Sequence, residues 1–426
     1  LISVSDKNNL EIILKILKKF KIKIISSGET FKAVKKLGYK CNEISKFTNS
    51  SEILEGRVKT LHPKIHAGIL NKRNNKFHKK QMKLNKYENI DLVIVNFYPF
   101  EKTLSKSKSD KTIIENIDIG GPTLARAAAK NFSDVTIITN PEQYKGLIGE
   151  LQKNRGATSF LYRQKLSEEA FSETAYYDST IANYFLSKTN KKFPKKKIIH
   201  SNLIEKLRYG ENPHQEAALY STNKEFDINK IHGKPLSYNN FNDIFSALKI
   251  SKSFPKNTGT VIVKHANPCG VSIKKKNIDS FKSALACDPI SAFGGIVACN
   301  FKINQKVAKE LIRNYYEVIV ANGFEPKALK YLKTRKNLRI INYNNSLNNN
   351  NFKIVSGLNS FLFQNNDDHV LGGKNFKIVS KVKPTKKIMK ELIFSFNVCR
   401  SVKSNAIVIS QNNKTLGIGS GQPSRL

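Results

Sequence analysis

Short apolar runs that end abruptly in polar, turn-forming residues constrain the fold of this chain more than any other feature. The clearest lies at 261–270, where Val-Ile-Val passes directly into Lys-His-Ala-Asn-Pro-Cys-Gly. Three β-branched residues predict a buried strand, and the residues after them favour a sharp turn over further pairing. Because α/β proteins place ligands at strand ends, Lys264 and His265 become candidate site residues. Taken alone, the stretch is explained equally well as a surface turn with a solvated histidine.

The first part of the chain repeats this pattern in a βαβ order. Strands are expected at 1–4, 22–25, 92–95 and 135–139, and helices at 8–20 and 123–131. The buried side of the first helix is expected to hold Ile12, Ile13, Ile16, Leu17 and Phe20. Five parallel strands with crossover helices are the simplest architecture for this unit.

Composition narrows the class of protein. A chain of 426 residues is too long for one core, so two or three domains are expected. No apolar run approaches the ~20 residues that span a bilayer, so no membrane partner is predicted. The formal charge of +40 comes mostly from lysines spread along the whole chain, which favours a solvated surface over a nucleic-acid footprint. Five cysteines without CxxC spacing indicate neither disulfides nor zinc and point to a reducing cytoplasm.

Several polar segments follow the predicted strands of the first unit. Ser-Ser-Gly-Glu-Thr at 26–30 could present helix N–H groups to a phosphate, although a plain helix cap explains it equally well. The run Gly-Arg-Val-Lys-Thr-Leu-His-Pro at 56–63 is more informative, because it packs many hydrogen-bond donors into one loop. Asn96 and Tyr98 follow the strand at 92–95, and Asp118 lies in an Ile-Asp-Ile-Gly-Gly-Pro run before the next helix.

These motifs, in this order, resemble the IMP cyclohydrolase part of the bifunctional family that joins this activity to AICAR transformylase. The resemblance implies a methylglyoxal-synthase-like fold that closes the ring of the formamido nucleotide FAICAR, with loss of water, to give IMP. The residues implied in holding the nucleotide are Ser5, Asp6, Lys7, Ser27, Gly28, Thr30, Arg57, Lys59 and Thr60. Those implied around the closing ring are Asn96, Tyr98, Asp118 and Lys130, with Lys130 as the proton-transfer group.

One position departs from the family pattern. The family's Ser/Thr-Gly-Gly-Thr reads Ser-Gly-Glu-Thr here, with Glu29 in the expected phosphate loop. A carboxylate beside a phosphate repels it unless the side chain points away. The chemistry itself fits the residue types, because Lys, Tyr and Asp beside backbone N–H groups can move a proton and stabilise an oxyanion without a metal.

The second part resembles the transformylase domain of the same family, whose subdomains have cytidine-deaminase-like topology. The motifs are at 207–215, 261–270, 288–296 and 403–425. No His-x-Glu and Pro-Cys-x-x-Cys set is present, which disfavours a zinc deaminase. The resemblance implies formyl transfer from 10-formyltetrahydrofolate to the poorly nucleophilic amine of AICAR. Its implied roles are His265 as base, Lys264 as charge stabiliser, Asn405 as orienting group, and Arg208, Tyr209, Gly294, Glu317 and Arg425 in substrate binding.

The predicted organisation is therefore a cyclohydrolase domain at 1–190, a charged linker at 191–206 and a transformylase domain at 207–426. The family also implies a cytoplasmic homodimer that acts on AICAR and FAICAR, with no metal and no nucleic acid. Compared with the family pattern, the sequence looks cut at both ends, so we expect impaired formyl transfer. Two alternatives stay open: a basic nucleic-acid-binding protein on a metabolic scaffold, and an inactive paralogue that serves in assembly.

Overall fold

The computed structural model describes residues 1–189, 191–222, 228–343, 352–367 and 370–424. The chain divides into two compact units, Leu1–His200 and Ser201–Leu426, each with its own hydrophobic core. The division falls inside the segment predicted as a linker, whose last residues begin a strand, β6 (Asn202–Leu207). The functional limits of the domains stay a prediction.

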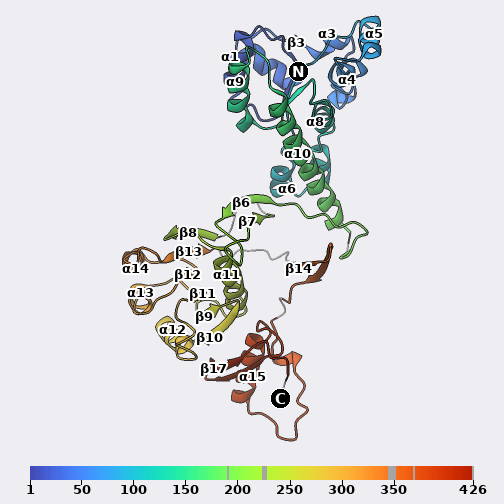
Figure 1. Cartoon of the computed structure of the whole chain (residues 1–426). Coiled ribbons are helices and arrows are strands. Elements are labelled where there is room, and N and C mark those ends of the chain that lie inside the picture. The colour runs from blue at the N-terminus through green and yellow to red at the C-terminus, as the bar shows by residue number, and fades with distance from the viewer. Residues whose placement is uncertain (190, 223–227, 344–351, 368–369, 425–426) are drawn as a thin grey trace. The chain divides into compact units, whose positions relative to one another are not determined.

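The first unit contains a five-stranded parallel sheet in the order β3-β2-β1-β4-β5 (Figure 1). Its strands are β1 (Ile2–Val4), β2 (Ile25–Ser26), β3 (Asn42–Glu43), β4 (Leu92–Asn96) and β5 (Thr136–Ile138). The predicted α/β class with a parallel sheet is confirmed. The residue range of β3 could not be predicted, because its two polar residues carry no apolar signal. Since all strands run the same way, the segments after β1, β2 and β4 meet at one edge of the sheet.

Ten α-helices of the described chain belong to this unit. They are α1 (Leu10–Lys19), α2 (Gly28–Lys36), α3 (Ile44–Thr48), α4 (Pro63–Leu70), α5 (Lys76–Leu84), α6 (Phe100–Lys106), α7 (Asp110–Glu115), α8 (Gly120–Lys130), α9 (Tyr144–Lys153) and α10 (Phe160–Ser187). Ile12 on α1 was expected inside but is 51% exposed, so this prediction was wrong. The buried stripe of α1 runs through Leu10, Leu14 and Leu17, and a period of 3.6 residues turns Ile12 to the opposite side.

Helix α8 follows the segment that contains the candidate residue Asp118. It starts at Gly120, earlier than the predicted start at 123, and its alanines pack against the long helix α10 (Figure 1). The Ser167 hydroxyl on α10 donates a 2.8 Å hydrogen bond to the Ala129 carbonyl. Small side chains let the two helix backbones approach closely, so the end of α8 is held firmly against α10.

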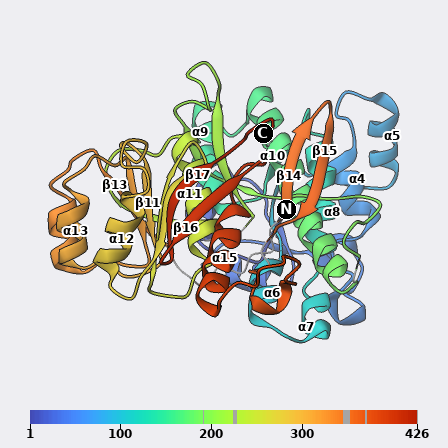
Figure 2. The same cartoon turned by 90° about the horizontal axis from the view of Figure 1, so that it is seen from below.

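The second unit is built on an eight-stranded mixed sheet in the order β16-β17-β10-β9-β11-β12-β13-β8. The strands are β8 (Ile228–His232), β9 (Gly259–Lys264), β10 (Asn267–Ile273), β11 (Ile296–Cys299), β12 (Val318–Ala321), β13 (Arg339–Tyr343), β16 (Ile407–Gln411) and β17 (Lys414–Gly419). Separate two-stranded ribbons are formed by β6 with β7 (Ala217–Ser221) and by β14 (Phe352–Gly357) with β15 (Ser360–Asn365). The helices are α11 (Tyr238–Ser251), α12 (Asn277–Leu285), α13 (Gln305–Leu311), α14 (Pro326–Leu332) and α15 (Lys386–Cys399). Strands β16 and β17 pair beside α15 (Figure 2).

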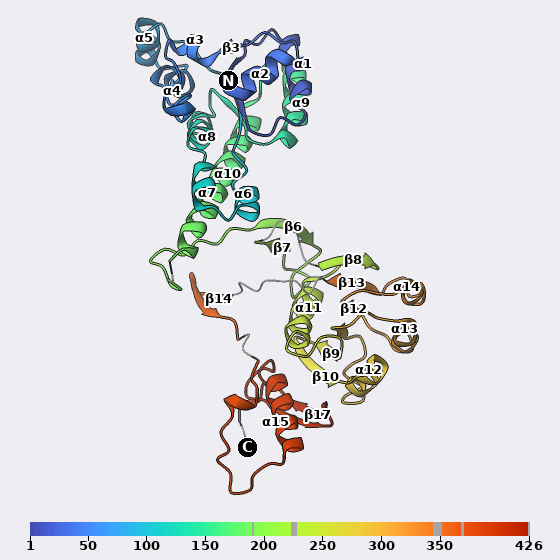
Figure 3. The same ribbon diagram turned by 180° about the vertical axis from the view of Figure 1, so that it is seen from behind.

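Strand β9 is buried on both faces. Val261 and Val263 contribute to the cluster that α11 covers, whereas Ile262 contributes to the cluster under α12, α13 and α14. Figures 1 and 3 show α11 on one side of the sheet and these three helices on the other. The strand predicted here is confirmed. The expectation that pairing stops after it was wrong, because Asn267 to Gly270 begin β10 and pair back onto β9.

Gly270 tests how tightly β10 packs against α12. A Cβ at this position would lie 1.9 Å from the Ala284 carbonyl oxygen, so the backbone would have to move. We expect Gly270→Ala to lower the free energy of unfolding by about 1–3 kcal/mol, as overpacking in a well-packed core does. The matched control is Gly417→Ala on β17, where nothing lies within 4 Å of the added Cβ. Urea unfolding followed by circular dichroism measures both, and equal midpoints for the two variants would contradict the packing described here.

Candidate active sites

The ends of β1 and β4 are joined by one amide side chain. Asn96 Oδ1 accepts hydrogen bonds from the Ser5 and Asp6 N–H groups at 2.7 and 2.8 Å, and its Nδ2 donates to the Asp6 carbonyl at 2.9 Å. This exhausts much of the hydrogen-bonding capacity of the amide. Asn96 therefore fixes the loop after β1, and the side chains of Ser5, Asp6 and Lys7 extend from this fixed backbone.

The start of α2 lies beside that loop. Thr30 is buried, and its hydroxyl bonds to both the N–H and the carbonyl of Val4, which ties the helix to β1. Ser27 is the N-cap residue and its side chain makes no cap hydrogen bond. The first N–H groups of a helix have no acceptor within the helix, so this end offers donors to an anion. Gly28 has a φ of 51°, a left-handed conformation that glycine adopts without strain.

Lys59 brings a cation to the same place. A Cβ added to Gly28 would lie 3.2 Å from Lys59 Nζ, which shows how close the ammonium is to the helix start. Glu52 pairs with Lys59 at 3.2 Å, and both side chains are about one-third exposed, at 33% and 31%. Gly56 has a φ of 86°, and a Cβ there would lie 2.3 Å from Lys59 Cε. The absence of a side chain at Gly56 thus lets Lys59 fold back toward α2.

Glu29, the departure from the family pattern, is engaged elsewhere. Its carboxylate pairs with Lys32 one turn along α2 at 2.7 Å, and both side chains are about three-quarters exposed. The bond and charge of Lys32 lower the pKa of Glu29, so the carboxylate stays ionised. Because Lys32 holds and partly neutralises it, Glu29 presents less charge to the helix start than the sequence suggested.

The loop that carries Lys59 also reaches the region before α8. Arg57 forms a two-bond ion pair with Glu115 at the end of α7. Thr60 is buried, and a Cβ added to Gly120 would lie 2.8 Å from its hydroxyl. Two segments about sixty residues apart in the sequence therefore meet beside the start of α8.

Asp118 organises the start of α8. Its carboxylate accepts hydrogen bonds from the Gly121 N–H at 2.8 Å and from the Tyr98 N–H at 3.3 Å. Its own N–H donates to the Tyr177 hydroxyl at 2.8 Å. Burial raises the pKa of Asp118 above its usual range, and the backbone hydrogen bonds oppose this shift. Sequence reasoning did not single out Tyr177, which lies on α10 far along the chain.

Lys130 is not brought to this cluster. It is exposed at the last residue of α8, nine residues beyond Gly121. With a rise of 1.5 Å per residue, the two Cα atoms are about 14 Å apart along the helix axis. The other candidates of the first unit lie at the carboxyl edge of the sheet or beside the start of α8. The role implied for Lys130 stays a prediction.

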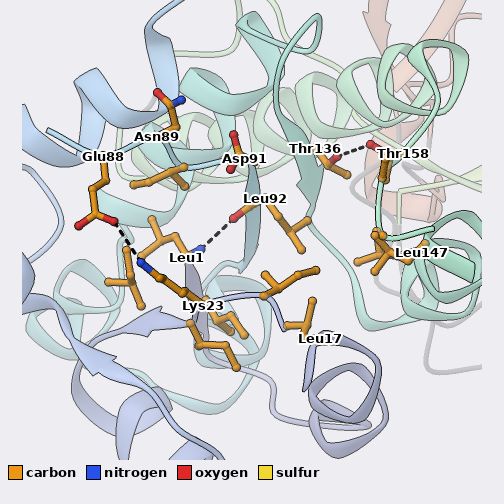
Figure 4. A pocket seen from close by; sticks show the side chains of 18 of the residues that line it. Leu1, Leu17, Lys23, Glu88, Asn89, Asp91, Leu92, Thr136, Leu147 and Thr158 are labelled. Carbon is orange, nitrogen blue, oxygen red and sulfur yellow. Dashed lines mark hydrogen bonds and ion pairs between the residues drawn. The ribbon is translucent and has the colours of Figure 1, made fainter. Parts of the chain in front are cut away.

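A cavity of about 670 Å³ lies at the other edge of the parallel sheet, where its strands begin (Figure 4). Its polar groups are largely paired with one another. Lys23 lies 3.9 Å from Glu88, the Leu1 nitrogen donates to the Leu92 carbonyl at 2.8 Å, and Thr136 bonds to Thr158 at 2.7 Å. None of the predicted site residues lines this cavity.

In the second unit, Lys264 and His265 lie at the tip of the β9–β10 hairpin. Lys264 pairs with Asn267, so the turn between them contains only His265 and Ala266, with φ values of 53° and 58°. The Lys264 ammonium donates to the Phe293 carbonyl at 3.0 Å. This bond joins the hairpin to the loop that contains Gly294, whose φ of 74° also lies in the left-handed region. Lys264 is half-buried and His265 is exposed.

Helix α11 supports this hairpin through residues that sequence reasoning missed. The Asp243 carboxylate accepts a 2.6 Å hydrogen bond from the Ala266 N–H. One turn further on, the Ser246 hydroxyl donates to the Ala266 carbonyl at 2.8 Å. Burial raises the pKa of Asp243, while the nearby backbone of the turn opposes this shift. No local signal singles out Asp243 or Ser246, because polar residues recur along the whole of α11.

Glu317 belongs to the same assembly. Its carboxylate accepts from the Asn240 side chain on α11 at 2.8 Å and pairs with the buried Arg339 at 3.4 Å. Its N–H donates to the Gly295 carbonyl at 3.1 Å, and the Gly294 N–H donates to the Tyr315 carbonyl at 2.9 Å. Glu317 thus links α11 to two strands and to the loop beside Lys264.

The remaining transformylase candidates lie on two further segments. Arg208 follows β6, and its guanidinium lies 5.5 Å from the centre of the Tyr209 ring. Their loop reaches α11 through a 3.2 Å bond from the Asn239 side chain to the Glu211 carbonyl. Asn405 donates to the Gln422 carbonyl at 3.0 Å, while the nearby Lys403 N–H reaches Asn267 at 3.5 Å. Arg425 lies outside the described residues.

The described part of the chain contains no group of three or more His, Cys, Asp or Glu side chains arranged to hold a metal. Within those same residues, every helix is too short or too polar to cross a membrane. The five cysteines are all free thiols.

Comparison with known proteins gives consistent matches over both units. A family described as "AICARFT/IMPCHase bienzyme" matches residues 128–426, and an "MGS-like domain" matches residues 9–123. The "Bifunctional purine biosynthesis protein PurH" of Elusimicrobium minutum (strain Pei191) is 41% identical, covering 100% of this chain and 82% of that protein. The protein of the same name from Persephonella marina (strain DSM 14350 / EX-H1) is 44% identical, covering 100% and 84%.

Among solved structures, "Crystal structure of ForH" is 28% identical and covers 45% of this chain and 97% of its own, with a TM-score of 0.40 that adds nothing to the assignment. The sequence matches confirm the resemblance and give no support to a nucleic-acid-binding protein on a metabolic scaffold. They extend over the whole chain, through both the parallel-sheet unit and the mixed-sheet unit. The chain therefore belongs to the AICARFT/IMPCHase bienzyme family.

Proposed function

We propose that the first unit closes the ring of FAICAR to give IMP and that the second unit transfers a formyl group from 10-formyltetrahydrofolate to AICAR. As a member of this family, the chain is an enzyme of these last two steps of IMP synthesis. The first assignment is supported by three features that lie near one another in this unit. They are the uncapped start of α2, the Lys59 ammonium beside it, and the residues bonded to Asp118 at the start of α8. The second rests on the Lys264–His265 turn and the loops bonded to it.

The nucleotide phosphate is proposed to bind at the start of α2. The N–H groups there and the Lys59 ammonium supply hydrogen bonds and positive charge to one spot. Lys7 lies on the neighbouring loop, where its ammonium contacts the Ser5 carbonyl at 3.4 Å. The lysine-rich surface raises the local concentration of such anionic substrates in a general way.

The closing ring is proposed to lie between this phosphate position and the start of α8. Ring closure requires a proton to leave the attacking amide nitrogen, an oxyanion to be stabilised and water to depart. The Tyr98 side chain is 49% exposed on a backbone fixed by Asp118, so its hydroxyl is free to act as a donor there. The Thr60 hydroxyl, beside Gly120 at the start of α8, adds a further donor near Asp118.

Replacing Lys59 tests the phosphate position. Hydrogen bonds to charged groups contribute about 1.5–3 kcal/mol, so Lys59→Met should raise the KM for FAICAR by about 10- to 100-fold. The matched control is Lys36→Met, which removes an exposed lysine from the last turn of α2. A spectrophotometric assay of ring closure measures both variants. An unchanged KM in Lys59→Met would remove Lys59 from the binding site.

Asp118→Asn tests whether the carboxyl serves activity at the expense of stability. We expect kcat for ring closure to fall about 100-fold or more, as loss of an acid–base group does. The pKa of Asp118 is higher in the folded chain than in the unfolded chain. The protonated carboxyl therefore stabilises the fold at pH values below its pKa in the unfolded chain. This contribution is lost as the pH rises through the pKa of the folded chain. The neutral amide avoids this pH-dependent loss, while its single acceptor oxygen keeps only one of the bonds from the Gly121 and Tyr98 N–H groups.

Relative to the wild type, the thermal midpoint of Asp118→Asn should therefore be higher at pH 7 than near pH 4. Differential scanning calorimetry at the two pH values gives the comparison. The contrary result is a midpoint that, compared with the wild type, is lower at pH 7 than at pH 4. It would show that the fold favours the ionised carboxylate.

For formyl transfer, His265 is proposed as the base that removes a proton from the AICAR amine as this amine attacks. Lys264 stabilises the developing negative charge and assists the departing folate nitrogen. The roles proposed for Asn405, Arg208, Tyr209, Gly294 and Glu317 remain those implied by the family: Asn405 orients His265 or the carboxamide, and the others hold AICAR. The bonds that connect all of their segments to α11 or to the hairpin support this arrangement.

A cytoplasmic homodimer is also proposed, on the basis of the family resemblance. The five free thiols are compatible with a reducing compartment. The chain has a mass of 48.1 kDa, so sedimentation velocity should give a particle of about twice that mass. A monomer at micromolar concentration would refute the dimer without affecting the assignment of the two activities.

A further inference from the structure

The turn that carries His265 adopts a conformation that its own residues do not favour. Both central residues of the two-residue β9–β10 turn have positive φ, at His265 and Ala266. Turns of this kind usually contain Asn-Gly or a similar pair, because a Cβ is crowded in the left-handed region. Alanine lacks the short polar side chain that lets asparagine tolerate it. Something outside the turn must hold this backbone in place.

The contacts of the turn identify what holds it. The Asp243 carboxylate accepts from the Ala266 N–H at 2.6 Å. The Ser246 hydroxyl donates to the Ala266 carbonyl at 2.8 Å, and the Asn267 side chain donates to the His265 carbonyl at 3.0 Å. The carbonyl groups of both turn residues and the Ala266 N–H are therefore bonded, and Asp243 is the acceptor for that N–H.

Helix α11 is a firm support for these bonds. Asp243 and Ser246 lie one turn apart on the same face of the helix. The Ser237–Asn240 capping box closes the start of the helix, and the Asn240 side chain also bonds to Glu317 at 2.8 Å. Ile244 and Ala247 are fully buried against the sheet. A carboxylate on such a helix can impose its own geometry on a turn that would otherwise relax.

We propose that Asp243 is a positioning residue for formyl transfer, whose carboxylate holds the His265–Ala266 backbone in the left-handed conformation and thereby directs the His265 side chain. This inference rests on the proposed role of His265 in the second unit. Asp243 acts through the backbone of the turn and not as a group that touches substrate. Lys264, the last residue of β9, is held independently by its bond to the Phe293 carbonyl.

The test combines removal of the carboxylate with a substitution that relieves the turn. Asp243→Ala removes the acceptor, and Ala266→Gly in the same chain supplies a residue that adopts positive φ without strain. The matched control is Asn242→Ala, which changes the exposed neighbouring residue of α11. Two quantities are measured in the full chain: the hydrogen-exchange rate of the Ala266 amide by NMR, and kcat and KM for AICAR in formyl transfer.

We expect Asp243→Ala to speed exchange of the Ala266 amide at least tenfold and to lower kcat about 10- to 100-fold, with a smaller change in KM. The double variant should recover several-fold in kcat, because glycine restores the turn without the carboxylate. Asn242→Ala should behave as the wild type. Unchanged exchange and kcat in Asp243→Ala would overturn the proposal.

Two further outcomes separate the inference from the proposed function. A loss of kcat that glycine does not relieve at all would show that Asp243 acts through its charge, which also overturns the positioning role. Faster exchange with unaltered formyl transfer would mean that Asp243 holds the turn but that the turn is not part of the reacting site. That outcome overturns the positioning role and leaves the contact between Asp243 and the turn in place, whereas a wild-type chain without formyl transfer would be a failure of the proposed function.

Discussion

Strand β9 has no face that meets solvent, and the second unit depends on this constraint. Val261 and Val263 pack toward α11, whereas Ile262 packs toward the helices on the other face. A strand buried on both sides cannot carry charged side chains within the buried stretch, and its first charged residue marks the place where burial ends. Lys264 is that residue. The candidate catalytic residues thus follow directly after the buried part of the strand. The Lys264 ammonium and the His265 imidazole are therefore attached to a rigid sheet.

The sequence predicted the elements whose signals are local. Apolar runs located β1, β4 and β9, and motifs at their ends located most of the candidate residues. It could not predict β3, whose two polar residues join the sheet only because β2 offers a free edge. The burial predicted for Ile12 was wrong, because the sequence of a helix with apolar residues on more than one side does not reveal which side meets the sheet.

Contacts between residues that are far apart in the sequence also could not be predicted. Asp243 supports a turn more than twenty residues away, and Tyr177 bonds to Asp118 from a helix 59 residues further on. Neither residue belongs to a motif that local spacing can reveal. Each was missed because its importance depends on which backbone groups the fold leaves without an acceptor or donor. That information exists only in three dimensions, since an unpaired buried N–H group costs about 1–3 kcal/mol wherever in the chain its partner originates.

The two units solve this problem in the same way. In the first, Asn96 Oδ1 accepts from two successive N–H groups, those of Ser5 and Asp6. In the second, the Asp243 carboxylate accepts from the Ala266 N–H at 2.6 Å, in the turn that follows β9. A segment that leaves a strand loses its ladder partners, and one oxygen-bearing side chain from a neighbouring element replaces them. The loop then becomes rigid without regular structure, and its own side chains remain available to a ligand. This division separates polar residues that build a site from those that can act in it, a distinction that residue type alone does not give.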